Sequence, residues 1–265
     1  MSGEIRAAFE RLKKEGRKAF IPYVTAGDPD LDTTVELVLE LERSGSAIVE
    51  LGIPFSDPLA DGPTIQRASE RALRHGYRLA DYLEGVERIR SRSGIPIVMF
   101  SYFNPILQYG LESLARDARM AGVNGLLVTD MTPEEGTEYR ACLEAQGVDP
   151  IFLAAPTSST ERVLRIVACT RGFVYIISRT GVTGTRDLLS EAIEPTVRRV
   201  RAHTDLPVAV GFGISRPEHV RAVWEIAEGA VVGSAIVAEI ERQSASGEVV
   251  ARVGEFCRWL IQPGG

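Results

Sequence analysis

Apolar residues follow two patterns along the chain. Short continuous apolar segments, rich in β-branched side chains, alternate with longer segments in which apolar residues recur every three or four positions. The first pattern is typical of strands buried on both faces of a parallel sheet, and the second is typical of amphipathic helices. We expect strands at residues 19–24, 47–51, 95–100, 125–128, 151–154, 173–177, 207–210 and 230–232. Helical spacing is clearest in residues 31–43, 110–121 and 160–169, and several helical segments end on a glycine directly before the next strand.

This alternation of strands and helices, without a linker or low-complexity segment, predicts one (β/α)8 TIM barrel that spans residues 1–265 as a single domain. An open doubly wound sheet is the alternative, but such sheets usually contain fewer strands. Ile5, Phe9 and Leu12 share one face of a helix that precedes the first strand. We expect this extra N-terminal helix to cover the N-terminal end of the barrel, and we expect functional residues in the loops that follow the strands.

The composition argues against several classes of protein. The net charge is −6 and the sequence has no stripe of Lys and Arg, so nucleic acid binding is not expected. We expect a cytoplasmic protein that does not cross a membrane, because the sequence lacks both a long apolar run and the apolar stretch of a signal peptide. Cys142, Cys169 and Cys257 are far apart and lack C-x-x-C spacing, which indicates reduced thiols rather than disulfides or a zinc site.

Glycine-rich segments follow the last three predicted strands. G-F-G-I-S (211–215) and G-S-A-I-V (233–237) follow the seventh and eighth strands, where TIM barrels often bind phosphate through backbone N–H groups. Two ordinary tight turns are the alternative, but the presence of a glycine-rich segment after both of these strands favours phosphate binding. S-R-T-G-V-T-G-T-R (178–186) follows the sixth strand and suits either a lid with a further phosphate contact or a plain long loop.

A run of carboxylates begins in the second predicted strand and continues into the loop after it, in E-L-G-I-P-F-S-D-P-L-A-D-G-P (50–63). Glu50 ends an apolar strand, where a buried glutamate favours a catalytic role, and burial would raise its pKa toward neutrality. Asp57 and Asp61 follow in a loop stiffened by prolines, and either one alone is typical of a surface turn. Tyr175 lies inside the sixth predicted strand, where a buried hydroxyl with a structural partner is the simpler interpretation.

The positions of the lysines and histidines narrow the chemistry. No lysine follows Lys18, so a Schiff-base aldolase is not expected. His75 and His219 fall in helical segments and His203 precedes the seventh strand, so no metal site is expected at the strand ends. Cleavage of a carbon–carbon bond would therefore depend on carboxylates and on a substrate that carries its own electron sink.

Several segments together resemble one known family. The chain contains, in order, Y-V-T-A-G-D-P, E-L-G-I-P-F-S-D-P-L-A-D-G-P-T-I-Q, F-L-A-A-P-T-S, S-R-T-G-V-T-G, G-F-G-I-S and G-S-A-I-V. These segments resemble the tryptophan synthase alpha subunit, and the resemblance extends from about residue 20 to residue 237. It implies a lyase of tryptophan biosynthesis that splits indole-3-glycerol phosphate reversibly into indole and glyceraldehyde 3-phosphate without metal or Schiff base.

The resemblance also implies roles for individual residues. Glu50 would protonate indole C3 and take the proton of the glycerol hydroxyl, Asp61 would accept the indole N–H, and Tyr175 would support Glu50. Thr183 would belong to a loop that closes near Asp61. The expected phosphate-binding residues are Gly184, Gly213, Gly233 and Ser234. The expected indole pocket consists of Tyr23, Phe100, Leu127, Leu153 and Phe212.

The family resemblance further implies a partner. A beta subunit would hold pyridoxal phosphate, would receive the indole and would form an alpha2-beta2 heterotetramer, while this chain would hold no cofactor and no metal. Asp57 and Pro58 resemble positions that dock the partner. The chain departs from the family pattern at Thr129 and Met131, after the fourth strand. At these two positions the resemblance does not define the pocket wall or the interface.

Three other hypotheses are compatible with the sequence. The chain could be a lyase of the same chemistry that works alone and releases free indole. It could instead be a catalytically inactive regulator of a beta subunit, although the presence of Glu50 and Asp61 argues against this. A sugar-phosphate isomerase on the same barrel is the third, and the extent of the resemblance argues against it.

Overall fold

Nine parallel strands form a barrel in the computed structural model, which describes residues 3–177, 193–211 and 213–262. The strands are β1 Ala19–Thr25, β2 Val49–Gly52, β3 Ile97–Ser101, β4 Gly125–Val128, β5 Asp149–Ile151, β6 Leu153–Ala154, β7 Val174–Ile177, β8 Val208–Gly211 and β9 Gly229–Val232. Their order is β5-β4-β3-β2-β1-β9-β8-β7-β6. Only Phe152 separates β5 from β6, so the two ends of the sheet are pieces of one predicted strand.

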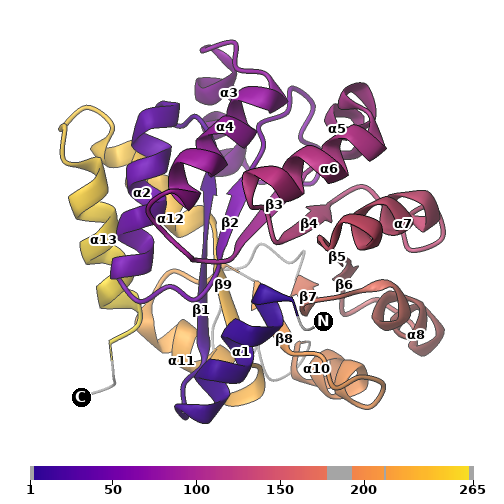
Figure 1. The fold of residues 1–265 in the computed structure, drawn as a ribbon. Helices are drawn as coiled ribbons and strands as arrows, with labels where there is room; N and C mark the ends of the chain where they lie inside the picture. Colours follow the sequence, from indigo (N-terminus) through magenta and orange to yellow (C-terminus); the bar gives the residue numbers. More distant parts are fainter. Residues whose placement is uncertain (1–2, 178–192, 212, 263–265) are drawn as a thin grey trace.

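Helices surround these strands (Figure 1). They are α1 Glu4–Lys14, α2 Leu31–Arg43, α3 Pro63–Leu73, α4 Leu79–Arg90, α5 Phe103–Tyr109, α6 Leu111–Ala121, α7 Thr137–Gln146, α8 Thr160–Cys169, α10 Glu194–Arg201, α11 Pro217–Ile226, α12 Ser234–Gln243 and α13 Val249–Leu260. The predicted TIM barrel with an extra N-terminal helix is therefore confirmed.

Two layers of apolar side chains hold the barrel together. Alternate strand residues point outward and pack under the helices, as Phe20 and Val24 of β1 do. The others point inward, and this inner cluster also contains Ile5, Phe9 and Leu12 of α1. The expectation that α1 covers the N-terminal end of the barrel interior is thus met, and the C-terminal end is left for other side chains.

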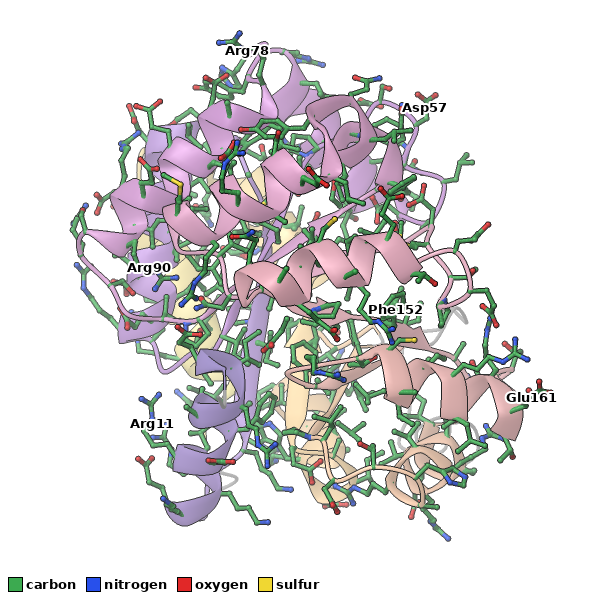
Figure 2. The ribbon with its side chains drawn as sticks, turned by 45° about the vertical axis from the view of Figure 1, so that its right-hand side comes forward. Arg11, Asp57, Arg78, Arg90, Phe152 and Glu161 are labelled. Carbon is green, nitrogen blue, oxygen red and sulfur yellow. The ribbon has the colours of Figure 1, made fainter. Side chains whose placement is uncertain are left out.

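The interruption between β5 and β6 coincides with a change of partner strand, since β5 pairs with β4 and β6 pairs with β7. Phe152, labelled in Figure 2, is buried and belongs to the outer cluster, where its ring lies 6.1 Å from that of Tyr139 on α7. The prediction of one continuous strand at residues 151–154 was therefore wrong in detail. Glycine ends two of the helices as expected, because Gly122 after α6 and Gly147 after α7 are left-handed, with φ of 97° and 73°.

Candidate active site

Glu50 lies on the inner face of β2, near the C-terminal end of that strand. The side chain is 1% exposed, and both carboxylate oxygens lack a hydrogen-bond partner among the described residues. Burial raises the pKa of Glu50 from 4.5 to about 8. A carboxyl group of this kind holds its proton at neutral pH and is able to give it up to a substrate.

Asp61 lies in the loop that connects β2 to α3. Its backbone N–H donates to the carbonyl of Pro58 at 3.0 Å, and its own carbonyl accepts from Nε2 of Gln66 at 2.9 Å. Burial raises the pKa of Asp61 to about 6, and hydrogen bonding to Tyr102 opposes that rise. Asp61 therefore ionises at a lower pH than Glu50, so one site holds a protonated and an ionised carboxyl group at neutral pH.

Tyr102 was not among the residues predicted from the sequence, and it anchors the Asp61 loop. It follows β3 directly and is 5% exposed. Its hydroxyl accepts the backbone N–H of Ala60 at 3.0 Å, and its ring lies 5.2 Å from the ring of Phe55. The signal available in the sequence was its place at the C-terminal end of a barrel strand, where this fold gathers functional side chains.

Two tyrosine rings each lie over a glycine of the neighbouring strand, in the space that a larger residue would fill. Tyr175 of β7 lies over Gly211 of β8, where a Cβ atom would stand 2.6 Å from the tyrosine hydroxyl oxygen. Tyr23 of β1 lies over Gly52 of β2, where a Cβ atom would stand 2.0 Å from the hydroxyl oxygen. Burial raises the pKa of Tyr175, and the negative charge of an ionised Glu50 raises it further.

The other expected pocket residues line the same interior. The rings of Tyr23 and Phe100 meet edge to face at 5.4 Å. Leu127 and Leu153 belong to the inner cluster, together with Tyr175. Phe212 lies outside the described residues. Aromatic and aliphatic side chains from β1, β3, β4, β6 and β7 thus line the barrel interior that Glu50 faces, which suits an apolar ligand.

The expected phosphate-binding residues come from the neighbouring strands β8 and β9. Gly213 follows β8, is exposed and has a φ of 35°. Gly233 precedes Ser234, the first residue of α12, and as a glycine it has no side chain that could cap this helix start. The N–H groups of Ile236 and Val237 donate to the Gly233 carbonyl, which leaves the N–H groups before them to face an anion. Thr183 and Gly184 lie outside the described residues.

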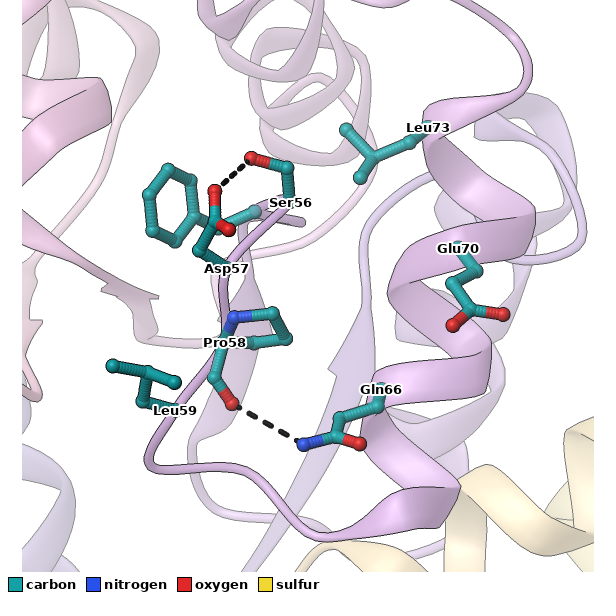
Figure 3. A pocket seen from close by; sticks show the side chains of 8 residues that line it. Ser56, Asp57, Pro58, Leu59, Gln66, Glu70 and Leu73 are labelled. Atoms are coloured by element: carbon teal, nitrogen blue, oxygen red, sulfur yellow. Dashed lines mark hydrogen bonds between the residues drawn. The ribbon is translucent and has the colours of Figure 1, made fainter.

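The outer side of the Asp61 loop borders a groove of about 290 Å³ (Figure 3). Asp57 and Pro58 line it together with Glu70 and Leu73 of α3. Asp57 accepts a hydrogen bond from Ser56 at 2.6 Å and lies at the edge of the molecule (Figure 2). Leu59, at the tip of the loop, is 94% exposed. Asp57 and Asp61 therefore face different surroundings, although they belong to one loop.

The departures at Thr129 and Met131 lie close to this site. Thr129 donates through its hydroxyl to the carbonyl of Ser101 at 3.4 Å, at the end of β3. Met131 packs against the outer cluster.

Within the described ranges, no group of three or more His, Cys, Asp or Glu side chains is placed to hold a metal ion. In the same ranges, no helix is both long and apolar enough to cross a membrane.

Over nearly its whole length, the chain is similar to proteins of one family. Residues 9–261 match the family model described as Tryptophan synthase alpha chain. The tryptophan synthase alpha chain of Solibacter usitatus (strain Ellin6076) is 50% identical over 252 residues, which cover 95% of this chain and 94% of that protein.

Solved structures show the same similarity. The tryptophan synthase subunit alpha from Legionella pneumophila str. Paris has a TM-score of 0.92 at 35% identity, covering 99% of this chain and 98% of that one. A chain of the tryptophan synthase complex from Pyrococcus furiosus has a TM-score of 0.84 at 37% identity, covering 92% of this chain and 97% of that one.

Proposed function

Because this chain belongs to the tryptophan synthase alpha chain family, we propose that Glu50 and Asp61 carry out the reaction of that family at the mouth of the barrel. The enzyme is a lyase that cleaves indole-3-glycerol phosphate reversibly into indole and glyceraldehyde 3-phosphate in tryptophan biosynthesis. The observation that carries the assignment of roles is the buried carboxyl group of Glu50, which has no hydrogen-bond partner among the described residues.

Glu50 acts first as an acid and then as a base. Its proton moves to C3 of the indole ring, which converts the ring into an indolenine whose C=N bond accepts the electrons of the breaking carbon–carbon bond. The resulting carboxylate takes the proton of the glycerol hydroxyl as the aldehyde forms, so Glu50 ends the reaction protonated. A pKa of about 8 suits a group that must both donate and accept a proton near neutrality.

Asp61 stabilises the positive charge that develops on the indole nitrogen. As an ionised carboxylate it accepts the ring N–H, and this interaction strengthens as the indolenine forms. Its pKa of about 6 keeps it ionised at neutral pH. Tyr175 supports Glu50 from the opposite wall of the barrel, and Thr183 belongs to the loop that we assign to closure.

The remaining residues bind the two ends of the substrate. The phosphate is held by backbone N–H groups at Gly184, Gly213, Gly233 and Ser234. This assignment is supported by the start of α12, whose N-cap residue Gly233 has no capping side chain, because a helix N-terminus favours an anion. The indole lies among Tyr23, Phe100, Leu127, Leu153 and Phe212. Polar binding at one end and apolar binding at the other fix the C3 carbon beside Glu50.

A beta subunit is the proposed partner of this chain. Support comes from the groove beside Asp57 and Pro58 and from the fully exposed side chain of Leu59. We propose an alpha2-beta2 assembly in the cytoplasm, in which residues 1–265 form one domain. Pyridoxal phosphate would belong to the beta subunit, and this chain would need no cofactor of its own.

The decisive experiment measures indole formation from indole-3-glycerol phosphate by the purified chain, with and without a beta subunit. Glu50→Gln should lower kcat by about 10²–10⁴-fold, the usual contribution of a general acid–base group. Substrate binding should remain within about twofold, because the phosphate site is untouched. Full activity of Glu50→Gln would refute the role of Glu50. An inactive wild-type chain would indicate a regulator, and strong activity without a partner would indicate a lyase that works alone.

A further inference from the structure

The loop that carries Asp61 is tied to the next strand of the barrel through Tyr102. Within residues 54–61, the other hydrogen bonds are turns of the loop itself or bonds to Gln66 of α3. Apart from these, Tyr102 is the only described residue that hydrogen-bonds to the loop, by accepting the backbone N–H of Ala60 at 3.0 Å. The place of Asp61 in the site therefore depends on the place of the Tyr102 hydroxyl.

The segment after β4 holds Tyr102 in turn, because it binds the chain on both sides of this residue. Before Tyr102, the carbonyl of Ser101 accepts the backbone N–H of Thr129 at 3.0 Å and its hydroxyl at 3.4 Å. After Tyr102, the backbone N–H of Phe103 donates to Oδ1 of Asp130 at 2.8 Å. Phe103 is the first residue of α5, and the helix has no side-chain cap of its own, so Asp130 caps it from a neighbouring loop.

The side chain of Tyr102 is fixed at both ends as a result. Its backbone is bound as described, its ring lies 5.2 Å from the ring of Phe55, and its hydroxyl meets the N–H of Ala60. The hydroxyl is the acceptor in that bond, so its proton stays free for a second one. Burial raises the pKa of Asp61, and hydrogen bonding to Tyr102 opposes that rise. A chain of contacts thus leads from Asp130 through one aromatic residue to Asp61.

We propose that Asp130 is a positioning residue for Asp61, which acts by holding Tyr102 where its hydroxyl fixes the Asp61 loop. This inference rests on the role proposed above for Asp61 at the indole N–H. Asp130 is exposed and hydrogen-bonds only to Phe103 among the described residues, so its effect on Asp61 passes through this chain of contacts. A carboxylate that must meet one ring N–H tolerates little displacement, because misplacement by about 1 Å can cost on the order of 10²-fold in rate.

The test compares the steady-state kinetics of indole-3-glycerol phosphate cleavage by Asp130→Ala and by the wild type, at saturating beta subunit. Asp130→Ala should lower kcat about tenfold, because Asp61 stabilises charge that develops only in the transition state. KM should stay within about twofold, since the phosphate and indole contacts are untouched. Asp130→Asn keeps an oxygen that accepts the Phe103 N–H, and it should recover at least about a third of the wild-type kcat.

A double variant shows whether Asp130 acts through Tyr102. Tyr102→Phe removes the hydroxyl that binds Ala60 but keeps the ring beside Phe55, and it should also lower kcat about tenfold. If both residues belong to one chain of contacts, the combination of Tyr102→Phe with Asp130→Ala should be within about twofold of the slower single variant. Losses that multiply to about a hundredfold would show independent roles and would overturn the inference.

Asp81→Ala is the control for this experiment. Its carboxylate also accepts a backbone N–H beside a helix start, from Arg78 at 2.6 Å, but α4 carries no part of the proposed site. Both alanine variants should lose a similar amount of Tm, about 2–5 °C, as the loss of a helix cap does. Only Asp130→Ala should lose kcat.

The remaining outcomes separate this inference from the proposed function. A wild-type kcat in Asp130→Ala, or a loss of beta-subunit affinity alone, would overturn the inference. If Asp61→Asn is inactive in that case, the proposed function still holds. A fully active Asp61→Asn would instead refute the role of Asp61, and the inference with it.

Discussion

At the scale of single residues, the site depends on whether a buried carboxyl group has hydrogen-bond partners. Glu50 and Asp28 are both 1% exposed, yet Asp28 accepts two hydrogen bonds from Arg71 and Glu50 accepts none from the described residues. A buried carboxylate that is paired with an arginine stabilises the fold. A buried carboxyl group without such a partner keeps its proton at neutral pH. The distinction lies in the partners of each carboxyl group, and composition does not reveal it.

The proton held by Glu50 links catalysis to stability. Its pKa is about 8 in the folded chain and 4.5 for a glutamate fully exposed to water, so the folded state binds more protons between these values. The free energy of unfolding should therefore fall as the pH rises through this window. We expect Glu50→Gln to be more stable than the wild type at pH 8, by up to a few kcal/mol, with the difference shrinking toward pH 4.5.

Thermal unfolding of both proteins at several pH values checks this expectation. The quantity to compare is the difference in Tm, because the buried amide of the variant carries a cost that does not depend on pH. A difference that stays constant from pH 5 to pH 8 would show that Glu50 is ionised in the folded state throughout that range.

At the scale of helices and strands, an ion-pair network ties together the elements that carry the site. Arg71 of α3 holds Asp28 through two hydrogen bonds of 2.8 Å, and it also donates to Glu241 of α12 at 2.8 Å. Arg67 pairs with the same Glu241 from a more exposed position. The loop after β1, the helix that follows Asp61 and the helix that starts at Ser234 are thereby joined.

Removing Arg71 should be far more costly than removing Arg67. Arg71→Met leaves the buried carboxylate of Asp28 without its partner and should lower the free energy of unfolding by roughly 3–5 kcal/mol. Arg67→Met breaks an exposed pair and should cost no more than about 1 kcal/mol. Denaturant unfolding of the two variants measures both values, and equal losses would contradict this account of the network.

The sequence predicted the strands better than the contacts between them. Continuous apolar runs placed the strands within about two residues, because strands buried on both faces have few polar positions. The short helix α5 was missed, since a helix of one or two turns with Pro105 near its start lacks a readable period. Tyr102 and Arg71 were missed because their partners lie far away in the sequence, 42 residues for Ala60 and 43 residues for Asp28.

At the scale of the whole molecule, one end of the barrel serves stability and the other carries the proposed site. At one end α1 adds its apolar face to the inner cluster. At the other end, both carboxyl groups, the three tyrosines and the start of α12 surround the proposed site. The loop that carries Asp61 also presents Leu59 to the surroundings at 94% exposure, so the proposed contacts with substrate and with partner fall on one segment.

Partner binding should therefore be sensitive to Leu59 while the fold is not. Leu59→Ser should weaken the affinity for a beta subunit at least about tenfold, as loss of an apolar anchor does at a protein interface, and should leave Tm within about 1 °C. The matched control is Leu164→Ser on α8, an exposed leucine elsewhere on the surface. Calorimetric titration compares them, and equal affinities would place the interface away from Leu59.

The position of α1 has a consequence for synthesis on the ribosome. Phe9 lies 5.8 Å, ring to ring, from Phe173, and a Cβ atom at Gly229 would lie 3.4 Å from its ring, so the first helix docks on segments that are translated long after it. At about 5–20 residues per second, the apolar face of α1 waits on the order of tens of seconds for its binding site. Throughout that interval the nascent chain exposes an amphipathic helix, and a chaperone that recognises such helices would have its best opportunity there.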